Sequence, residues 1–449
     1  MSNQEFIPAS EFCDLVTDGT HDSPKKTESG VKLVTSKNIV GGKLDLTSAY
    51  FISESDAQNI NKRSQVHIND VLLSMIGTVG EVALIEKEPD FVIKNVGLLK
   101  NSDPKKAKWL YYYLKSPITQ NLIKDRLRGT TQQYIPLGEL RNLPILKPNS
   151  EEHLQNTIDQ LSSLDKKIQL NTQINQTLEQ IAQALFKSWF VDFDPVRAKV
   201  QALSDGMSLE QAELAAMQAI SGKTPEELTA LSQTQPDRYA ELAETAKAFP
   251  CEMVEIDGGE VPKGWKIGTF TDITEPRREK VKNDKATVLS AVSSGELVKS
   301  EEYFTKQVFS KSIDKYLKVY QWDFAYNPAR INIGSIGLHE ADYLGAVSPV
   351  YEVFSVSDKY HWFLKRILNL ETTKIKIQFL CTGSVRQTLK LKDFQSIDCV
   401  IPDEKTLSIF NKKWEEYRTL ILENNENTHT LSEIRDLLLP RLLSGEIQL

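Results

Sequence analysis

The sequence predicts an α+β protein of two similar α/β modules, each followed by a long helix, with the two helices paired as an antiparallel coiled coil. The first observation behind this prediction is an internal repeat, because segments of the second half return 253 or 254 residues after counterparts in the first half. The second is a pair of long amphipathic segments that close the two copies. The third is a series of short β-rich runs within each copy. Two copies of one unit predict approximate two-fold symmetry.

The repeat recurs along the chain and is not confined to one motif. Tyr50-Phe51 returns as Tyr303-Phe304, and Asp70 returns as Asp323, each 253 residues later. Two modules related by a two-fold axis match the symmetry of the DNA backbone, so such a chain could read two half-sites at a fixed spacing. A duplication without that use is the alternative explanation.

Length and composition indicate a multidomain globular protein. At 449 residues the chain exceeds what one hydrophobic core covers, and its 40% hydrophobic and 26% charged content is ordinary. It has no apolar run of about 18 residues for a membrane span. Its start lacks the basic and apolar regions of a signal peptide. The cysteines lack paired spacing and are expected to be free thiols, so a cytoplasmic location is expected.

Charge is divided unevenly among five predicted segments. Residues 196–262 hold 5 Lys and Arg against 12 Asp and Glu, so this segment accounts for the whole net charge of −7. The two modules carry a small positive excess, as a phosphate-facing surface requires. The predicted boundaries are 1–148 for the first module, 149–195 for the first long helix, 196–262 for an acidic helical linker, 263–402 for the second module and 403–449 for the second long helix.

Strands and helices are expected in a similar order in both modules. In the first, strands are expected at 31–34, 70–76 and 82–85, and helices at 107–115 and 118–127. In the second, strands are expected at 286–292, 322–326 and 348–354, and a helix at 360–368. Helices in the linker are expected at 209–220, 225–231 and 238–248.

Each module is followed by a long amphipathic helix. Asn149 and Glu152 predict a capping box at the start of the first helix, and Pro195 is expected to end it. A helix of about 38 residues spans roughly 57 Å, which is too long for the flank of one module. We therefore expect the two helices to pair with each other, with packing of each against its own module as the alternative. A two-fold axis across the pair would make it antiparallel, and its length would set the distance between the modules.

The expected seam of the pair has an asparagine at the same position of both helices. Asn171 and Asn424 are 253 residues apart, and a buried asparagine at such a position commonly fixes the register. The seam is expected to contain Leu161, Ile168, Asn171, Leu178 and Ile181 of the first helix and Trp414, Ile421, Asn424, Leu431 and Ile434 of the second.

The sequence contains no convincing catalytic or metal-binding pattern. There is no phosphate-binding loop of the G-x-x-x-x-G-K-[ST] type. Residues 327–330 lack the second proline and the aromatic residue of an amino-methyltransferase motif, and residues 402–405 are better explained as a helix start than as a nuclease motif. Asp18, His21 and Asp22 lie in a Gly- and Thr-rich stretch typical of a turn. We therefore predict no catalytic residue, no metal and no cofactor bound by this chain.

Several stretches resemble a known family. Residues 18–24 (Asp-Gly-Thr-His-Asp-Ser-Pro), 33–39, 77–80 and 129–136 resemble the first target-recognition domain of type I restriction-modification specificity subunits. Residues 261–265 (Val-Pro-Lys-Gly-Trp) resemble the entry to the second such domain, and 184–193 and 437–446 resemble that family's two conserved regions. The order and duplication of these motifs, over nearly the whole chain except the acidic linker, make the resemblance specific.

The resemblance implies a non-catalytic subunit that confers sequence specificity. Each recognition domain would read one half of a bipartite double-stranded DNA target in the major groove. The helices would set the spacer and dock two methyltransferase subunits, which bring S-adenosylmethionine. Two restriction subunits, which use ATP and Mg²⁺, could then join. A pseudo-symmetric protein adaptor that binds no DNA is the alternative.

Candidate DNA-binding residues have planar or paired hydrogen-bonding ends, or are basic, and lie in or beside matching loops. In the first module they are Lys25, Lys26, Lys37, Asn38, Arg126, Arg128, Thr130, Thr131, Gln132, Gln133 and Tyr134. In the second they are Arg277, Arg278, Lys280, Lys282, Arg330, Ser384, Arg386 and Gln387. Any one of them could instead be an ordinary solvated residue. Because Gln-Gln in one loop corresponds to Arg-Gln in the other, we expect an asymmetric target.

Overall fold

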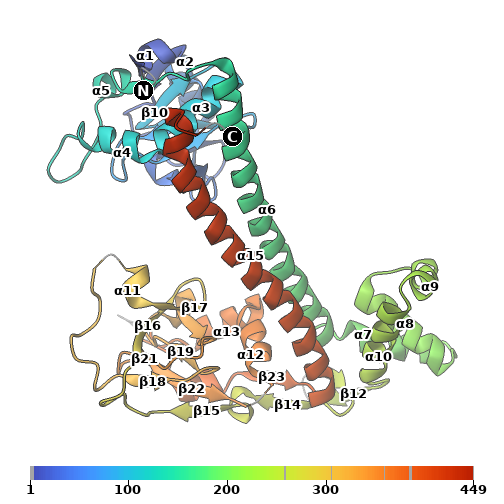
Figure 1. The fold of residues 1–449 in the computed structure, drawn as a ribbon. Helices are drawn as coiled ribbons and strands as arrows, with labels where there is room; N and C mark the ends of the chain where they lie inside the picture. Colours follow the sequence, from blue (N-terminus) through green and yellow to red (C-terminus); the bar gives the residue numbers. More distant parts are fainter. Residues whose placement is uncertain (1–4, 257–258, 305, 358, 384–386, 448–449) are drawn as a thin grey trace. The chain divides into compact units, whose positions relative to one another are not determined.

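The computed structural model describes residues 5–256, 259–304, 306–357, 359–383 and 387–447. The chain divides into two compact units, many of whose elements are labelled in Figure 1. Unit 1 contains residues 1–174 and 422–449, and unit 2 contains residues 175–421. Each unit combines a mixed module of strands and helices with one half of each long helix, in agreement with the predicted α+β class.

Unit 1 is built from short strands and the helices that pack on them. Its elements are β1 (Phe6–Pro8), α1 (Ala9–Phe12), β2 (Leu15–Asp18), β3 (Val31–Thr35), η1 (Ser36–Asn38), β4 (Ile39–Val40), β5 (Lys43–Leu44), β6 (Tyr50–Ile52), α2 (Glu54–Ser64), β7 (Val71–Ser74), β8 (Val82–Leu84), β9 (Phe91–Lys94), β10 (Val96–Lys100), α3 (Pro104–Lys115), α4 (Pro117–Lys124), α5 (Leu137–Arg141) and β11 (Pro144–Leu146). An antiparallel sheet has the order β2-β10-β7-β8. A second sheet has the order β6-β3-β9, with β3 parallel to β9, and β1 pairs with β11.

Unit 2 repeats this arrangement. Its module contains β14 (Lys266–Thr269), η2 (Phe270–Asp272), β15 (Thr274–Arg277), β16 (Thr287–Val292), β17 (Glu296–Lys299), α11 (Ser300–Tyr303), β18 (Leu317–Val319), β19 (Phe324–Tyr326), η3 (Ile331–Ile333), β20 (Ile336–Leu338), β21 (Gly345–Val347), β22 (Glu352–Val356), α12 (His361–Leu368), α13 (Glu371–Leu380), α14 (Leu391–Gln395) and β23 (Asp398–Ile401). An antiparallel sheet has the order β15-β22-β19-β20, and a second has the order β17-β16-β21-β18 with β16 parallel to β21. The pairing of β14 with β23 corresponds to that of β1 with β11.

The repeated aspartates occupy the same turn in both modules. Asp70 and Asp323 are buried at the start of β7 and β19, and each side chain accepts a hydrogen bond from a backbone N–H three residues earlier, at 2.8 and 2.9 Å. The residue before each aspartate has a positive φ, 71° at Asn69 and 69° at Trp322. The repeat in the sequence is therefore also a repeat in the backbone conformation.

The other repeated pair is not equivalent in structure. Tyr50 lies in β6, whereas Tyr303 ends the short helix α11. After these residues the units diverge, because unit 1 forms the helix α2 while the described residues between α11 and β18 form no regular element. The shared Tyr-Phe dipeptide therefore marks the same place along the chain without the same conformation.

The long helices are α6 (Glu151–Phe190) and α15 (Glu404–Ser444). The expected capping box of Asn149 and Glu152 is wrong by one residue, because Ser150 Oγ accepts the N–H of His153 at 3.0 Å. The helix start expected at 402–405 is confirmed, since Asp403 Oδ1 accepts the N–H of Thr406 at 3.0 Å. Ser150 and Asp403 are 253 residues apart, so the two caps are equivalent.

The acidic linker forms a small helical bundle within unit 2. Its helices are α7 (Asp194–Ser204), α8 (Leu209–Ser221), α9 (Pro225–Thr234) and α10 (Pro236–Ala248), followed by a hairpin of β12 (Met253–Ile256) and β13 (Gly259–Pro262). The expectation that Pro195 ends the first long helix is wrong. That helix ends at Phe190, the backbone turns at Phe193 with a φ of 58°, and Pro195 lies in the first turn of α7. Proline fits there because the N–H that it lacks would have no helical partner.

Among the described residues, no helix is long and apolar enough to cross a membrane. The core of unit 1 includes Leu154, Ile158 and Leu161 of α6 together with Leu439, Leu442 and Leu443 of α15. The core of unit 2 includes Phe186, Trp189 and Phe190 of α6 together with Leu407, Phe410 and Trp414 of α15. In each unit the two helices therefore pack together and against the module, with the beginning of one beside the end of the other.

Candidate nucleic-acid interface

An exposed hairpin follows α4 in unit 1. Arg128 and Tyr134 exchange backbone hydrogen bonds of 2.8 and 2.9 Å, and the four residues 130–133 between them are exposed. Gly129 has a φ of 87°, and a Cβ there would lie 2.4 Å from the carbonyl oxygen of Gln132. Only glycine therefore fits this turn. Because the module fixes the ends of the hairpin while its tip remains free, the tip can present hydroxyl, amide and phenol groups to a ligand.

Unit 2 holds the equivalent hairpin, 254 residues later. Thr382 and Thr388 exchange backbone hydrogen bonds of 3.1 and 2.8 Å, and Gly383 has a φ of 124°. Gln387 is exposed and accepts a hydrogen bond of 3.4 Å from Asn332. Its position corresponds to that of Gln133. The candidates Ser384 and Arg386 lie outside the described residues.

The two arginines beside the first hairpin differ in accessibility. Arg126 is 24% exposed, donates to the carbonyl oxygen of Leu122 at 2.8 Å and lies 3.9 Å from Glu139. Arg128 is 59% exposed and pairs with the same carboxylate at 3.0 Å. Arg126 therefore supports the hairpin from within the module, whereas Arg128 can exchange Glu139 for a phosphate group.

The remaining candidates of unit 1 are exposed, with one exception. Lys25, Lys26 and Lys37 are exposed, and the Lys26 ammonium lies 4.8 Å from the ring centroid of Tyr50. The prediction for Asn38 is wrong, because its side chain is buried. Its oxygen accepts from the N–H and hydroxyl of Thr35, and its nitrogen donates to Asp45 and Ser48. It holds the loop after β3 together and presents no free group to DNA.

In unit 2 the arginines at the end of β15 are already paired. Arg277 forms an ion pair of 2.7 Å with buried Asp323, and Arg278 pairs with Glu352 at 2.5 Å. Lys280, Lys282 and Arg330 are exposed, and no described carboxylate forms an ion pair with them. Arg277 thus balances a buried charge of the module, and the lysines are better placed to meet an external anion.

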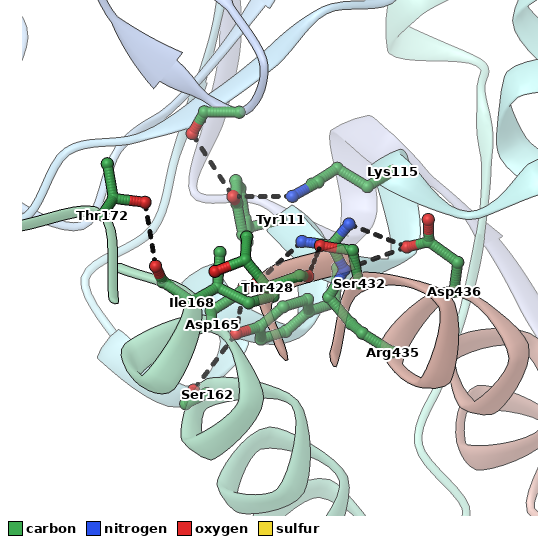
Figure 2. A network of polar contacts seen from close by, with 12 residues as sticks. Tyr111, Lys115, Ser162, Asp165, Ile168, Thr172, Thr428, Ser432, Arg435 and Asp436 are labelled. Carbon is green, nitrogen blue, oxygen red and sulfur yellow. Dashed lines mark hydrogen bonds and ion pairs between the residues drawn. The ribbon is translucent and has the colours of Figure 1, made fainter. Parts of the chain in front are cut away.

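A polar network joins the module of unit 1 to the helix pair (Figure 2). Arg435 of α15 pairs with Asp165 of α6 at 2.9 Å and also with Asp436 at 2.9 Å. The hydroxyl of Tyr112, on α3, donates to Asp165 at 3.0 Å. Burial, with the charge of Asp165 beside it, raises the pKa of Tyr112, so this phenol remains a donor. One carboxylate therefore links three helices.

The equivalent joint of unit 2 is built around Arg366 of α12, which is 2% exposed. Its Nη1 pairs with Glu179 of α6 at 2.7 Å, and its guanidinium lies 3.8 Å from the ring centroid of Trp414 on α15. Trp362, also on α12, donates its indole N–H to Glu415 at 2.7 Å. Sequence reasoning missed Arg366 and Arg435, because arginines between apolar helical positions are indistinguishable from surface residues.

The seam residues vary in burial. Leu161 and Trp414 are buried, and Ile168, Asn171, Leu178, Ile421, Asn424 and Leu431 are half-buried. Asn171 Nδ2 lies 3.4 Å from the Asn424 carbonyl oxygen and 3.4 Å from Thr428 Oγ1. Ile181 and Ile434, at 41% and 40% exposure, lie outside the buried seam. Their neighbours take the inward positions instead: Ala182 is buried in the core of unit 2, and Arg435 pairs with Asp165 of α6. The stripe advances there by four residues and not by the predicted three.

Within the described part of the chain, no group of three or more His, Cys, Asp or Glu residues is placed to hold a metal ion. Asp18 is buried and pairs with Arg63 and, at 3.1 Å, with His21, so these residues stabilise their loop. Cys13 and Cys399 are free, and burial raises the pKa of each thiol to about 12. The two equivalent hairpins, 128–134 and 382–388, and the basic side chains beside them therefore offer hydrogen-bonding groups and positive charge to a ligand.

The chain is similar to proteins of one functional class. Residues 1–180 match the family described as type I restriction modification DNA specificity domain. The chain is 44% identical over 352 residues to the type I restriction enzyme HindI specificity subunit of Haemophilus influenzae, with 73% of each chain covered. It is 24% identical over 399 residues to the MjaIX specificity subunit of Methanocaldococcus jannaschii, covering 84% of this chain and 77% of that protein. The solved type I restriction-modification S subunit from M. genitalium aligns with a TM-score of 0.48 and 14% identity, over 98% of this chain and 97% of that one.

Proposed function

The chain belongs to the family of type I restriction-modification DNA specificity subunits, and from this premise we propose that each of its modules reads one half of a bipartite double-stranded DNA target. The hairpins 128–134 and 382–388 are the proposed reading elements. The chain supplies specificity and no catalysis. A protein adaptor that binds no DNA is the alternative, and family membership disfavours it.

The observation that carries the proposal is that two loops are closed in the same way but differ in the sequence between their closing residues. Both follow a helix, both are closed by paired backbone bonds and both begin with a glycine at positive φ. The first presents Thr-Thr-Gln-Gln and the second ends in Gln387 after different residues. Glutamine offers the paired donor and acceptor that adenine requires in the major groove. Two hairpins that are closed by the same backbone bonds but carry different side chains are suited to recognising two different half-sites.

The helices α6 and α15 are proposed to set the spacer. They contain 40 and 41 residues, so each is about 60 Å long at 1.5 Å per residue. We propose that their outer faces dock two methyltransferase subunits and that two restriction subunits join that complex. S-adenosylmethionine, ATP and Mg²⁺ would be bound by those partners. A subunit that reads chromosomal DNA must share its compartment, which supports a cytoplasmic location.

The decisive experiment replaces the tip of one hairpin. The double variant Gln132→Ala/Gln133→Ala, assembled with its methyltransferase subunits, is expected to lose about 1–3 kcal/mol of discrimination at one half-site only. Genome-wide mapping of modified bases, in a strain where this variant replaces the wild-type chain of an otherwise intact system, would show one half of the motif relaxed. The other half and the spacer should be unchanged.

The matched control is Gln58→Ala, which removes an exposed glutamine from α2 of the same module. It should leave the whole motif unchanged. A continuous motif, or a motif that survives deletion of this chain, would refute the bipartite reader. An unaltered motif in the hairpin variant, with a bipartite motif in the wild type, would refute only the role of the hairpin.

The spacer is tested by shortening both helices at once. Residues 169–175 and 421–427 face each other around Asn171 and Asn424, so their joint deletion removes about two turns from each helix. The loss of about 10 Å corresponds to about three base pairs of spacer. Half-site sequences should remain the same, and an unchanged spacer would exclude the helices as the ruler.

A further inference from the structure

Unit 2 carries a cluster of lysines that neither the hairpin nor the helix joint uses. Three lie in the loop between β15 and β16, and three lie in the segment between α11 and β18. All six are exposed, and none forms an ion pair with a described residue. We call this cluster the lysine ridge, and it consists of Lys280, Lys282, Lys285, Lys306, Lys311 and Lys315.

The structure brings the two segments together. The N–H of Val281 donates to the Tyr316 carbonyl oxygen at 2.9 Å, and the N–H of Lys282 donates to the Asp314 carbonyl oxygen at 3.0 Å. The side chains of Val281 and Tyr316 are buried in one small apolar cluster. Lys280 and Lys282, on either side of Val281, and Lys315, beside Tyr316, are exposed. Residues far apart in the sequence thus form one positive surface.

Two of the carboxylates beside this surface are held by another cation. Lys318, whose side chain is 10% exposed, pairs with Glu279 and Asp284 at 2.6 Å each. Tyr320 also donates to Glu279 at 2.8 Å. Hydrogen bonds from Lys318 and Tyr320 lower the pKa of Glu279, and hydrogen bonds to Asp284 and Glu279 raise the pKa of Lys318. Both carboxylates are therefore occupied by Lys318. The exposed carboxylate of Asp314, in the second segment, forms no ion pair with a described residue, so the six lysines remain available.

In unit 1 the loop between β2 and β3, which corresponds to the loop between β15 and β16, carries exposed Lys25 and Lys26. The stretch that corresponds to the second segment, residues 53–70, is largely the helix α2, which begins with Glu54 and Asp56. Its two basic side chains have partners, because Arg63 pairs with Asp18 and Lys62 donates to Asn59 at 2.9 Å. The second segment of the lysine ridge is thus a departure from the internal symmetry of the chain.

We propose that the lysine ridge binds the phosphate backbone of double-stranded DNA beside the half-site read by unit 2. Lysine ammonium groups are flexible point charges, which suit phosphates and carry no base-reading geometry. The ridge makes unit 2 the more salt-sensitive anchor and contributes equally to target and non-target duplexes. The inference rests on the proposed DNA-reading function and adds a second, sequence-independent contact to it.

The test measures salt dependence in the complex with the methyltransferase subunits. The ridge variant carries Lys280→Gln, Lys282→Gln, Lys311→Gln and Lys315→Gln. Each lysine that no longer neutralises a phosphate should reduce the slope of log affinity against log salt by about 0.9 and the affinity at physiological salt about fivefold. We expect a reduction of about 2–4 in the slope, equal for a target duplex and a random duplex. Discrimination between the two duplexes should be unchanged.

The matched control replaces four exposed lysines of unit 1, Lys43, Lys62, Lys87 and Lys106, by glutamine. Its slope should stay close to that of the wild type. Equal slopes for ridge and control variants would overturn the ridge, whereas a wild-type complex that binds neither duplex would overturn the DNA-reading function as well. The single variant Lys311→Gln, in a segment without regular structure, tests the same contact should the fourfold variant fold poorly.

Discussion

The joints between module and helix pair use equivalent positions in the two units, yet they are built from different side chains. Leu161 in unit 1 corresponds to Trp414 in unit 2, and Leu442 corresponds to Trp189, each 253 residues apart. The joint of unit 1 is aliphatic with a polar network, and the joint of unit 2 is largely aromatic. Duplication has therefore kept the backbone and the positions of contact, while the packing chemistry has diverged.

The ion pairs of the two joints differ in the same way. Arg435 in unit 1 is 19% exposed and has two carboxylate partners, Asp165 and Asp436. Arg366 in unit 2 is 2% exposed and has one described carboxylate partner, Glu179. A buried cation with a single charged partner depends strongly on that partner, whereas a partly exposed cation with two partners depends less on either of them. The joint of unit 2 should accordingly be less tolerant of the loss of a charged partner.

The largest effect is expected from truncating the matched pair at the centre of each joint. Trp414→Ala should cost about 3–5 kcal/mol, because it removes a buried indole and the ring that covers Arg366. Leu161→Ala should cost about 2–4 kcal/mol. Hydrogen exchange measured peptide by peptide should show weaker protection in unit 2 for the first variant and in unit 1 for the second. Equal changes in both units for either variant would contradict independent joints.

The ion pairs give a smaller and more selective test. Glu179→Gln should destabilise unit 2 by about 2–3 kcal/mol, a value reduced because Glu179 is half exposed. It leaves Arg366 without a charged partner, and the Nε and Nη2 of that guanidinium already lack a described partner. Asp165→Asn should cost about 1 kcal/mol, because Arg435 retains Asp436. Urea unfolding of both variants measures the difference, and a reversed order would contradict the role assigned to burial.

Much of the fold could be predicted because periodicity and repetition are properties of the sequence itself. Expected strands at 31–34 and 82–85 and the helix at 360–368 are found within a residue or two, as β3, β8 and α12. The pairing of the long helices followed from their length. The misplaced cap shows where the signal was ambiguous, since Asn149 and Ser150 are both capping residues. Comparison with Asp403, 253 residues later, selects Ser150.

The candidate site was less predictable, because exposure depends on distant parts of the chain. Asn38 and Gln133 are both polar loop residues in the sequence, but one is buried in a network and the other is exposed at a hairpin. Arg366 is buried only because Glu179 and Trp414 come to meet it from two other helices. Of the lysine ridge, the sequence predicted only Lys280 and Lys282 as DNA-binding residues, since the two segments of the ridge are joined only in the folded chain.

The helix caps compare the two units at one equivalent position. Asp403→Ala should cost about 2 kcal/mol, because Asp403 caps α15 and also accepts the indole N–H of Trp265 at 2.8 Å. Ser150→Ala should cost about 1 kcal/mol, because Ser150 caps α6 alone. Thermal unfolding of the two variants checks the order. Asp403→Ser is the matched control, since it keeps the cap and removes the hydrogen bond with Trp265, and it should fall between them.

The smallest effect is expected at the centre of the helix pair, which resembles neither joint. Here the seam is polar, with Asn171 beside Asn424 and Thr428. Asn171→Leu should change the unfolding free energy by less than about 1 kcal/mol, and in the stabilising direction, because an apolar side chain replaces a half-buried amide. We expect the substitution to loosen the register in which the two helices pair. Spin labels at exposed Lys167 and His429 should give one narrow distance in the wild type and a broader distribution in Asn171→Leu. Thr172→Leu, which changes the exposed neighbour, should leave the distribution narrow. A narrow distribution in Asn171→Leu would mean that the two joints alone fix the register. In that case the different packing of the two joints, and not the asparagine in the seam, determines how the helices align.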